Sequence, residues 1–191
     1  MKLLNSFGPN PRKVRMYMYE KGLELPLVDI DLFGGENRRP PYTERNPGGQ
    51  IPSLELNDGS VIAETVAICE YLEEKHPSPP LIGATPEQRA ETRMWIRRIE
   101  LGITEFVYAG FRYAEGLQLF QNRLLCLPEA ADGMKQKGRA GMEWIDPLLE
   151  GKAYICGDRF SLADIVLYCA LDFGISVGQP IPDGLDTLKA W

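Results

Sequence analysis

A proline-rich segment near the middle of the 191-residue sequence divides it into two parts with different patterns. His76-Pro77-Ser78-Pro79-Pro80 places three prolines within five residues, and proline neither continues a helix nor donates a hydrogen bond to a sheet. Before this segment, strand-like and helical patterns alternate; after it, only helical patterns occur. We therefore expect an α/β domain over residues 1–76, a linker over 77–84 and an all-helical domain over 85–191.

The first part begins with a pattern typical of a β-α-β unit. A short apolar run at 2–5 predicts a strand, and the helical spacing of apolar residues predicts a helix over 11–21. Apolar and acidic residues alternate over 27–32, which predicts a half-buried strand. The stretch 33–49 is rich in Gly, Pro, Asn and Arg and predicts a loop with a short helical turn at 41–44. A tight Asp-Gly turn within 53–62 predicts a hairpin.

The second part contains two clear helix starts. Thr85-Pro86-Glu87-Gln88 has a capping threonine, a proline at the first helical position and a glutamine three residues after the cap. The helical spacing that follows predicts one long helix to about Glu115, with further helices over 128–149 and from Ser161 onward. Ser161 and Asp164 have the spacing of a second capping pair, which we expect to serve folding rather than chemistry.

Composition excludes several classes of function. The chain has 27 acidic and 21 basic residues, a net charge of −6, which argues against an extended surface for nucleic acid or an anionic membrane. His76 is the single histidine, so we expect neither a metal site nor a Ser-His-Asp triad. The four cysteines form no CxxC pair and are expected to be free thiols. No apolar stretch is long enough to span a membrane, and we expect a cytoplasmic protein.

Two motifs give the sequence a family resemblance. Gly49-Gln50-Ile51-Pro52-Ser53-Leu54, followed after the hairpin by Ile62-Ala63-Glu64-Thr65-Val66-Ala67-Ile68, resembles the glutathione-binding half of a cytosolic glutathione transferase. Gly157-Asp158-Arg159-Phe160-Ser161-Leu162-Ala163-Asp164-Ile165 is similar to the capping motif of that family's helical domain. The resemblance covers nearly the whole chain. It implies a thioredoxin-like domain followed by an all-helical domain, with a cis Ile51-Pro52 bond.

The resemblance also implies glutathione as co-substrate and suggests where it binds. Thr65 at a helix start offers a hydroxyl and N–H groups to the γ-glutamyl carboxylate, and Glu64 can pair with the ammonium. A cis Ile51-Pro52 bond would expose the Ile51 N–H and C=O to the cysteinyl backbone. An ordinary helix cap remains the alternative for Glu64-Thr65, and a solvated loop arginine for the arginines at 38 and 39. The expected binding residues are Pro9, Arg39, Gln50, Ile51, Pro52, Glu64 and Thr65.

The segment expected to activate the thiol departs from the serine and cysteine branches of the family. The usual serine or cysteine position falls on Gly8 to Asn10, where no hydroxyl or thiol occurs. Gly34-Gly35-Glu36-Asn37-Arg38-Arg39-Pro40 and Ala63-Glu64-Thr65 resemble the atypical fungal and bacterial branch, in which a helix N-terminus is thought to stabilise the thiolate. The candidates that assist it are the side chains of Asn10 and Ser6 and a hydroxyl from Tyr113 or Tyr108. Aromatic walls for the second substrate are expected from Phe7, Tyr108 and Phe111.

The sequence therefore predicts a glutathione transferase that conjugates glutathione to small hydrophobic electrophiles, in detoxification or stress. A non-catalytic glutathione- or ligand-binding regulatory protein on the same fold is the alternative. A glutathione-dependent disulfide reductase would need a cysteine near Gly8 to Asn10. The resemblance, together with apolar Tyr71, Trp95 and Ile99 on the helices that flank the linker, predicts a homodimer.

Overall fold

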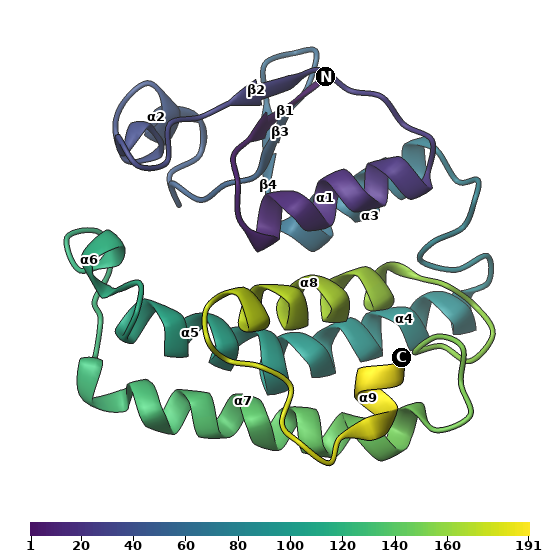
Figure 1. The fold of residues 1–191 in the computed structure, drawn as a ribbon. Helices are drawn as coiled ribbons and strands as arrows, with labels where there is room; N and C mark the ends of the chain where they lie inside the picture. Colours follow the sequence, from purple (N-terminus) through teal and green to yellow (C-terminus); the bar gives the residue numbers. More distant parts are fainter. The chain divides into compact units, whose positions relative to one another are not determined.

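Leu3 and Leu4, in the apolar run at the start of the sequence, are buried in a central strand of the sheet. In the computed structural model, which describes residues 1–191, this sheet has the order β2-β1-β3-β4 (Figure 1). β1 pairs in parallel with β2 and antiparallel with β3, and β3 pairs antiparallel with β4. The strands are β1 (Lys2–Asn5), β2 (Leu27–Asp29), β3 (Ser53–Glu55) and β4 (Val61–Ala63).

Two helices of this region pack on each other, and one of them also contacts the sheet. α1 (Pro9–Glu20) and α3 (Thr65–Lys75) lie side by side, and α3 also contacts β3 and β4 (Figure 1). The buried Tyr17 hydroxyl of α1 donates to Glu73 Oε2 of α3 at 2.5 Å, and Lys21 Nζ donates to the same oxygen at 2.6 Å. The connection from β2 to β3 contains a 3₁₀ turn, η1 (Glu36–Arg38), and the short helix α2 (Tyr42–Arg45).

Two local predictions differ from the structure. The first helix begins at Pro9 rather than at Pro11, because Gly8 adopts a φ of 108° at the cap and Pro9 suits the first helical position. The predicted half-buried strand over 27–32 is wrong in both length and burial. β2 ends at Asp29 and all three of its residues are exposed, since it lies at the edge of the sheet; Ile30, just after it, is the buried residue.

The second region is entirely helical (Figure 1). One long helical stretch consists of α4, a π-helical segment and α5, and it packs against α8 and α7. The elements are α4 (Pro86–Ile99), η2 (Glu100–Thr104), α5 (Glu105–Tyr113), α6 (Leu117–Phe120), η3 (Pro128–Ala130), α7 (Ala131–Ile145), η4 (Asp146–Leu149), α8 (Leu162–Ser176) and α9 (Asp186–Ala190). The prediction of an α/β part followed by an all-helical part is confirmed.

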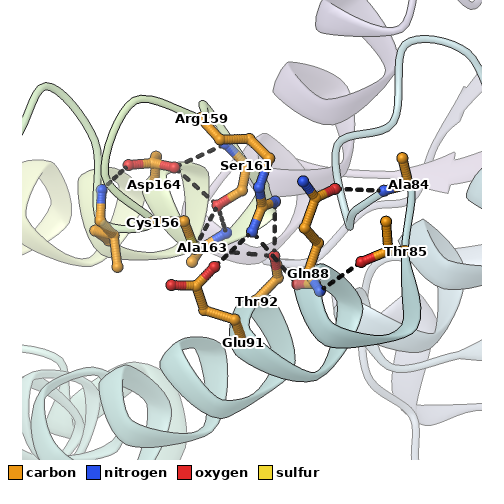
Figure 2. Close-up of polar contacts among 11 residues, drawn as sticks. Ala84, Thr85, Gln88, Glu91, Thr92, Cys156, Arg159, Ser161, Ala163 and Asp164 are labelled. Atoms are coloured by element: carbon orange, nitrogen blue, oxygen red, sulfur yellow. Dashed lines mark hydrogen bonds and ion pairs between the residues drawn. The ribbon is translucent and has the colours of Figure 1, made fainter.

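The two predicted helix caps are present and lie in one polar cluster (Figure 2). Ser161 and Asp164 form a reciprocal capping box at the start of α8, and Asp164 Oδ1 also accepts from the Ile155 N–H at 2.8 Å. Thr85 caps α4 by accepting from the Gln88 N–H at 3.3 Å. Arg159, two residues before the α8 cap, links the two helices, since its guanidinium donates to the Gln88 C=O at 3.3 Å in the first turn of α4 and to Thr92 Oγ1 at 3.0 Å further along it.

The chain divides into two compact units, Met1–Leu81 and Ile82–Trp191. We call them unit 1 and unit 2. All four cysteines are free, with Cys69 and Cys169 buried. None of the helices combines the length and the apolar character needed to cross a membrane.

Candidate functional site

The strand register brings three predicted site segments to one end of the unit 1 sheet. Ser53 at the start of β3 faces Leu4 of β1 and Ala63 of β4. Since β3 is antiparallel to both neighbours, the residues that follow β1, precede β3 and follow β4 meet at this end. These residues are Ser6 to Asn10, Gln50 to Pro52 and Glu64 to Thr65. Residues far apart in sequence thus converge at one end of the sheet.

The start of α1 offers few amide donors. Pro9 and Pro11 have no N–H, and the Arg12 N–H donates to the Gly8 C=O at 3.2 Å. No side chain caps the helix, which leaves the Asn10 N–H as the donor that the first turn presents. Asn10 Oδ1 accepts from Lys13 Nζ at 3.2 Å, so its side-chain NH₂ group is the part turned to other partners. Lys13 is only 3% exposed and places a positive charge beside this turn.

Ser6 has a different environment from the one expected of a thiol activator. It is 5% exposed, and its hydroxyl donates to the Ile30 C=O at 3.2 Å. A serine hydroxyl has one proton to donate, so this bond engages the donor that a thiolate would require. The Ser6 C=O accepts from Arg15 at 2.9 Å, which fixes the loop between β1 and α1.

Ile51 presents a backbone edge to its surroundings. The Ile51–Pro52 bond is cis, as the resemblance implied. The Ile51 N–H and C=O form no hydrogen bond within the chain, whereas the Ile51 side chain packs against the buried cluster of Leu4, Ile30 and Tyr42. The side chain therefore anchors the residue and the backbone pair is available to an extended peptide.

The junction of β4 and α3 carries a strained residue. Glu64 has φ 69° and ψ 123° and is the only residue other than glycine with a positive φ. Its side chain is exposed and makes no capping hydrogen bond, so the first N–H groups of α3 keep no side-chain partner at the cap. Thr65 is half-buried as the first residue of the helix. This helix start is suited to an anion, with a carboxylate beside it for a cation.

Two predicted polar contacts are exposed. The Gln50 side chain is exposed, while its C=O accepts from Tyr42 and Asn46. Arg39 is exposed and donates to the Gly34 C=O at 2.9 Å within its own loop.

The aromatic candidates differ in burial. Phe7 is 54% exposed and its ring lies 4.7 Å from that of Phe33. In unit 2, Tyr108 is 7% exposed, and burial raises the pKa of its hydroxyl. Its ring and that of Phe111 both make edge contacts with Phe173 at 5.2 Å, whereas Tyr113 is half-buried at the end of α5. Packing thus accounts for the Tyr108 ring, and Phe7 is the most open of the three predicted aromatic walls.

Comparison with known proteins decides the family. A glutathione S-transferase N-terminal domain profile matches residues 7–75, and a glutathione S-transferase C-terminal domain profile matches residues 128–191. The chain belongs to the glutathione S-transferase family. Glutathione S-transferase 2 of Saccharomyces cerevisiae is 35% identical over 193 residues, covering 96% of this chain and 80% of the yeast protein.

Other members of the glutathione S-transferase family agree in fold and differ in name. A solved glutathione S-transferase domain-containing protein of Marinobacter aquaeolei superposes with a TM-score of 0.93 at 36% identity, covering 100% of this chain and 95% of that protein. A protein named maleylacetoacetate isomerase, from Pseudomonas aeruginosa, is 29% identical and covers 86% of this chain and 78% of its own length. Family membership therefore supports glutathione chemistry without specifying the second substrate.

Sequence reasoning missed the residues whose side chains fix the backbone of the site segments. Arg15, Asn37, Tyr42 and Asn46 donate to backbone carbonyls in and around the site segments. The polar composition of 33–49 pointed to Asn37, Tyr42 and Asn46 without revealing their partners, and no sequence pattern pointed to Arg15.

Proposed function

We propose that this protein is a glutathione transferase that conjugates the thiolate of glutathione to small hydrophobic electrophiles in detoxification or stress. The observation that carries the proposal is the convergence, at one end of the unit 1 sheet, of the unused Ile51 backbone pair and the uncapped start of α3. Glutathione has a peptide backbone in its middle and an ammonium and a carboxylate at its γ-glutamyl end. The two segments match these groups in order and in charge.

In this proposal Ile51 pairs with the cysteinyl backbone of glutathione. Thr65 and the first amides of α3 hold the γ-glutamyl carboxylate, and Glu64 holds the ammonium. Gln50 adds a polar contact, Pro52 shapes the edge, and Arg39 binds the glycine carboxylate once it leaves the Gly34 carbonyl.

The thiol is activated at the start of α1. Lowering a thiol pKa by about two units requires ~2.7 kcal/mol. A helix N-terminus supplies about 0.3–1 kcal/mol, rising to ~2 when partly buried, and a hydrogen bond to a charged group supplies ~1.5–3. Pro9 sets the helix direction, and the backbone N–H and side-chain NH₂ of Asn10 are the donors we assign to the sulfur. The buried Lys13 charge acts in the same direction.

Titration calorimetry with glutathione tests the binding site. Glu64→Ala and Thr65→Val should each weaken binding by at least about 1 kcal/mol, because each leaves a charged ligand group without its partner. Glu74→Ala, which removes an exposed carboxylate at the other end of α3, should bind as the wild type does. Unchanged affinity in both site variants would refute the assignment.

Conjugation of a generic aryl halide, measured beside binding, tests catalysis. Turnover supports the transferase, whereas tight binding without turnover favours the non-catalytic alternative.

Ultraviolet titration of the bound thiolate then locates the activator. Ser6→Ala and Asn10→Ala should each reduce turnover by less than about a hundredfold, or ~2.7 kcal/mol. If one of these variants, or Tyr113→Phe, alone returns the thiol pKa to about 8.5, that side chain is the activator and the shared mechanism fails.

A further inference from the structure

Three buried amide and phenol groups hold the backbone just before Ile51. Asn37 Nδ2 donates to the Gly49 C=O at 2.6 Å. The Tyr42 hydroxyl and Asn46 Nδ2 both donate to the Gln50 C=O, at 2.6 Å and 2.8 Å. Asn37 and Tyr42 are 2% exposed and Asn46 is 6% exposed, so the three donor side chains are largely shielded from water.

These three side chains replace the hydrogen bonds that a neighbouring strand would supply. β3 begins only at Ser53, so Gly49 and Gln50 lie outside the strand pairing and depend on side chains for their position. The Tyr42 hydroxyl also lies 3.1 Å from Ser53 Oγ, the first residue of β3. These donors therefore extend the fixed geometry of the sheet across Gln50 and toward Ile51.

Packing fixes the same segment from a second direction. The Tyr42 ring belongs to the buried cluster of Leu4 and Ile30 against which Ile51 packs. Gly49 has a φ of 59°, and a Cβ there would lie 2.8 Å from the Asn37 C=O oxygen. A side chain does not tolerate so close an approach, so only glycine at position 49 lets this backbone lie against η1.

We propose that Asn37, Tyr42 and Asn46 are positioning residues for glutathione binding. They hold the carbonyls of Gly49 and Gln50, so that the Ile51 N–H and C=O stand at a fixed depth and angle for the cysteinyl backbone. They act through the Ile51 backbone and contact no reacting atom. The inference rests on the proposed function, since it assigns these side chains to the same glutathione site.

Tyr42→Phe is the variant that tests the inference. It removes the hydroxyl and keeps the ring in its apolar cluster. Tyr17→Phe is the matched control, since Tyr17 is a buried tyrosine of the same unit whose hydroxyl donates to Glu73, away from the Ile51 segment. Both variants should lower the thermal midpoint. Only Tyr42→Phe should weaken glutathione binding, by about five- to tenfold, the effect of one ordinary hydrogen bond. Its kcat at saturating glutathione should stay within about twofold of wild type, as expected for loss of uniform binding.

Amide hydrogen exchange in the free protein gives a readout that needs no ligand. The Gly49 amide, which donates to the Asn46 C=O at 2.8 Å in the same segment, should exchange faster in Tyr42→Phe than in the wild type or in Tyr17→Phe. Equal glutathione affinity in wild type and Tyr42→Phe would overturn the inference while leaving the proposed function intact. An equal loss of affinity in both variants would overturn it as well, because general destabilisation would then explain the effect. A wild-type protein that binds no glutathione would refute the proposed function and the inference together.

Discussion

At the scale of single residues, Glu64 is the clearest link between backbone conformation and ligand binding. A positive φ costs an L-residue about 1–2 kcal/mol relative to the right-handed region. Glycine would avoid this cost, yet the chain places a glutamate there with its side chain exposed and uncapped. Strain retained at such a position is consistent with a side chain that is needed for its charge.

Glu64→Gly and Glu64→Ala separate the strain from the charge. Glu64→Gly should raise the free energy of unfolding by up to about 1 kcal/mol, because it relieves the strained φ. The gain is smaller than the full strain energy, since glycine also makes the unfolded chain more flexible. Glu64→Ala keeps the strain and should leave stability within about 0.5 kcal/mol of wild type. Both should lose glutathione affinity to a similar extent, as measured by urea unfolding and calorimetry. A Glu64→Gly protein less stable than Glu64→Ala would show that the backbone there is not strained.

The sequence suggested those candidate site residues whose role would follow from local position. Thr65 was suggested because a helix start has unpaired N–H groups, and Ile51 because it precedes the family's proline. Ser6 and Asn37 depend on partners 24 and 12 residues away, and no local pattern encodes such pairings. The sequence therefore listed Ser6 as a donor without showing that Ile30 already accepts its proton, and it gave no role to Asn37.

At the scale of elements, the long helix of unit 2 contains a feature that periodicity did not show. One continuous helix was expected from Thr85 to about Glu115, and the structure inserts the π-helical segment η2 between α4 and α5. Gly102 of η2 lies against Gly141 of α7, where a Cβ on Gly141 would be 2.1 Å from the Gly102 C=O oxygen. A one-residue shift in hydrogen bonding changes the apolar spacing too little to be read from sequence, but the contact requires glycine.

Replacement of two glycines of α7 tests this contact. Gly141→Ala should destabilise the protein by about 1–3 kcal/mol, because the added methyl group meets backbone that cannot move aside. Gly133→Ala on the same helix has no atom within 4 Å of the new Cβ and should stabilise by about 0.5–1 kcal/mol. Urea unfolding of the two variants gives both values, and equal effects would show that the close approach of η2 and α7 is relaxed in solution.

The capping box of α8 makes a pH-dependent contribution to stability. Burial raises the pKa of Asp164 above its ordinary value of 3.8, although hydrogen bonds from Ile155 and Ser161 act in the opposite direction. The folded state therefore holds the Asp164 proton more tightly than the unfolded chain does. The stability from this protonation is fully present below about pH 3.8 and is lost as the pH rises through the folded pKa. The unfolding free energy of wild type relative to Asp164→Asn should accordingly fall as the pH increases through this range. Urea unfolding from pH 3.5 to 7 measures it, and a relative stability that rises would contradict the direction of the shift.

At the scale of the whole molecule, the structure changes the evidence for a homodimer. Trp95 and Ile99, two of the residues that suggested a subunit contact, are 8% and 0% exposed and belong to the core of unit 2. Met94 and Leu101 of the same helical stretch are 41% and 54% exposed. They lie seven residues apart, which places them on one face of a helix. Apolar spacing thus did not distinguish the inner face of this helix from its outer face.

Sedimentation measurements test the homodimer that we propose. At micromolar concentration the protein should sediment at twice the 21.5 kDa of one chain, because most oligomers of identical chains are two-fold dimers with self-complementary apolar contacts. Met94→Glu combined with Leu101→Glu places two buried like charges in each half of that contact and should shift the equilibrium to monomer. Leu125→Glu removes a more exposed leucine, 83% accessible and outside this helix, and should leave the dimer intact. A 21.5 kDa species in the wild type would refute the dimer, and a dimer that survives the double substitution would place the contact on another face.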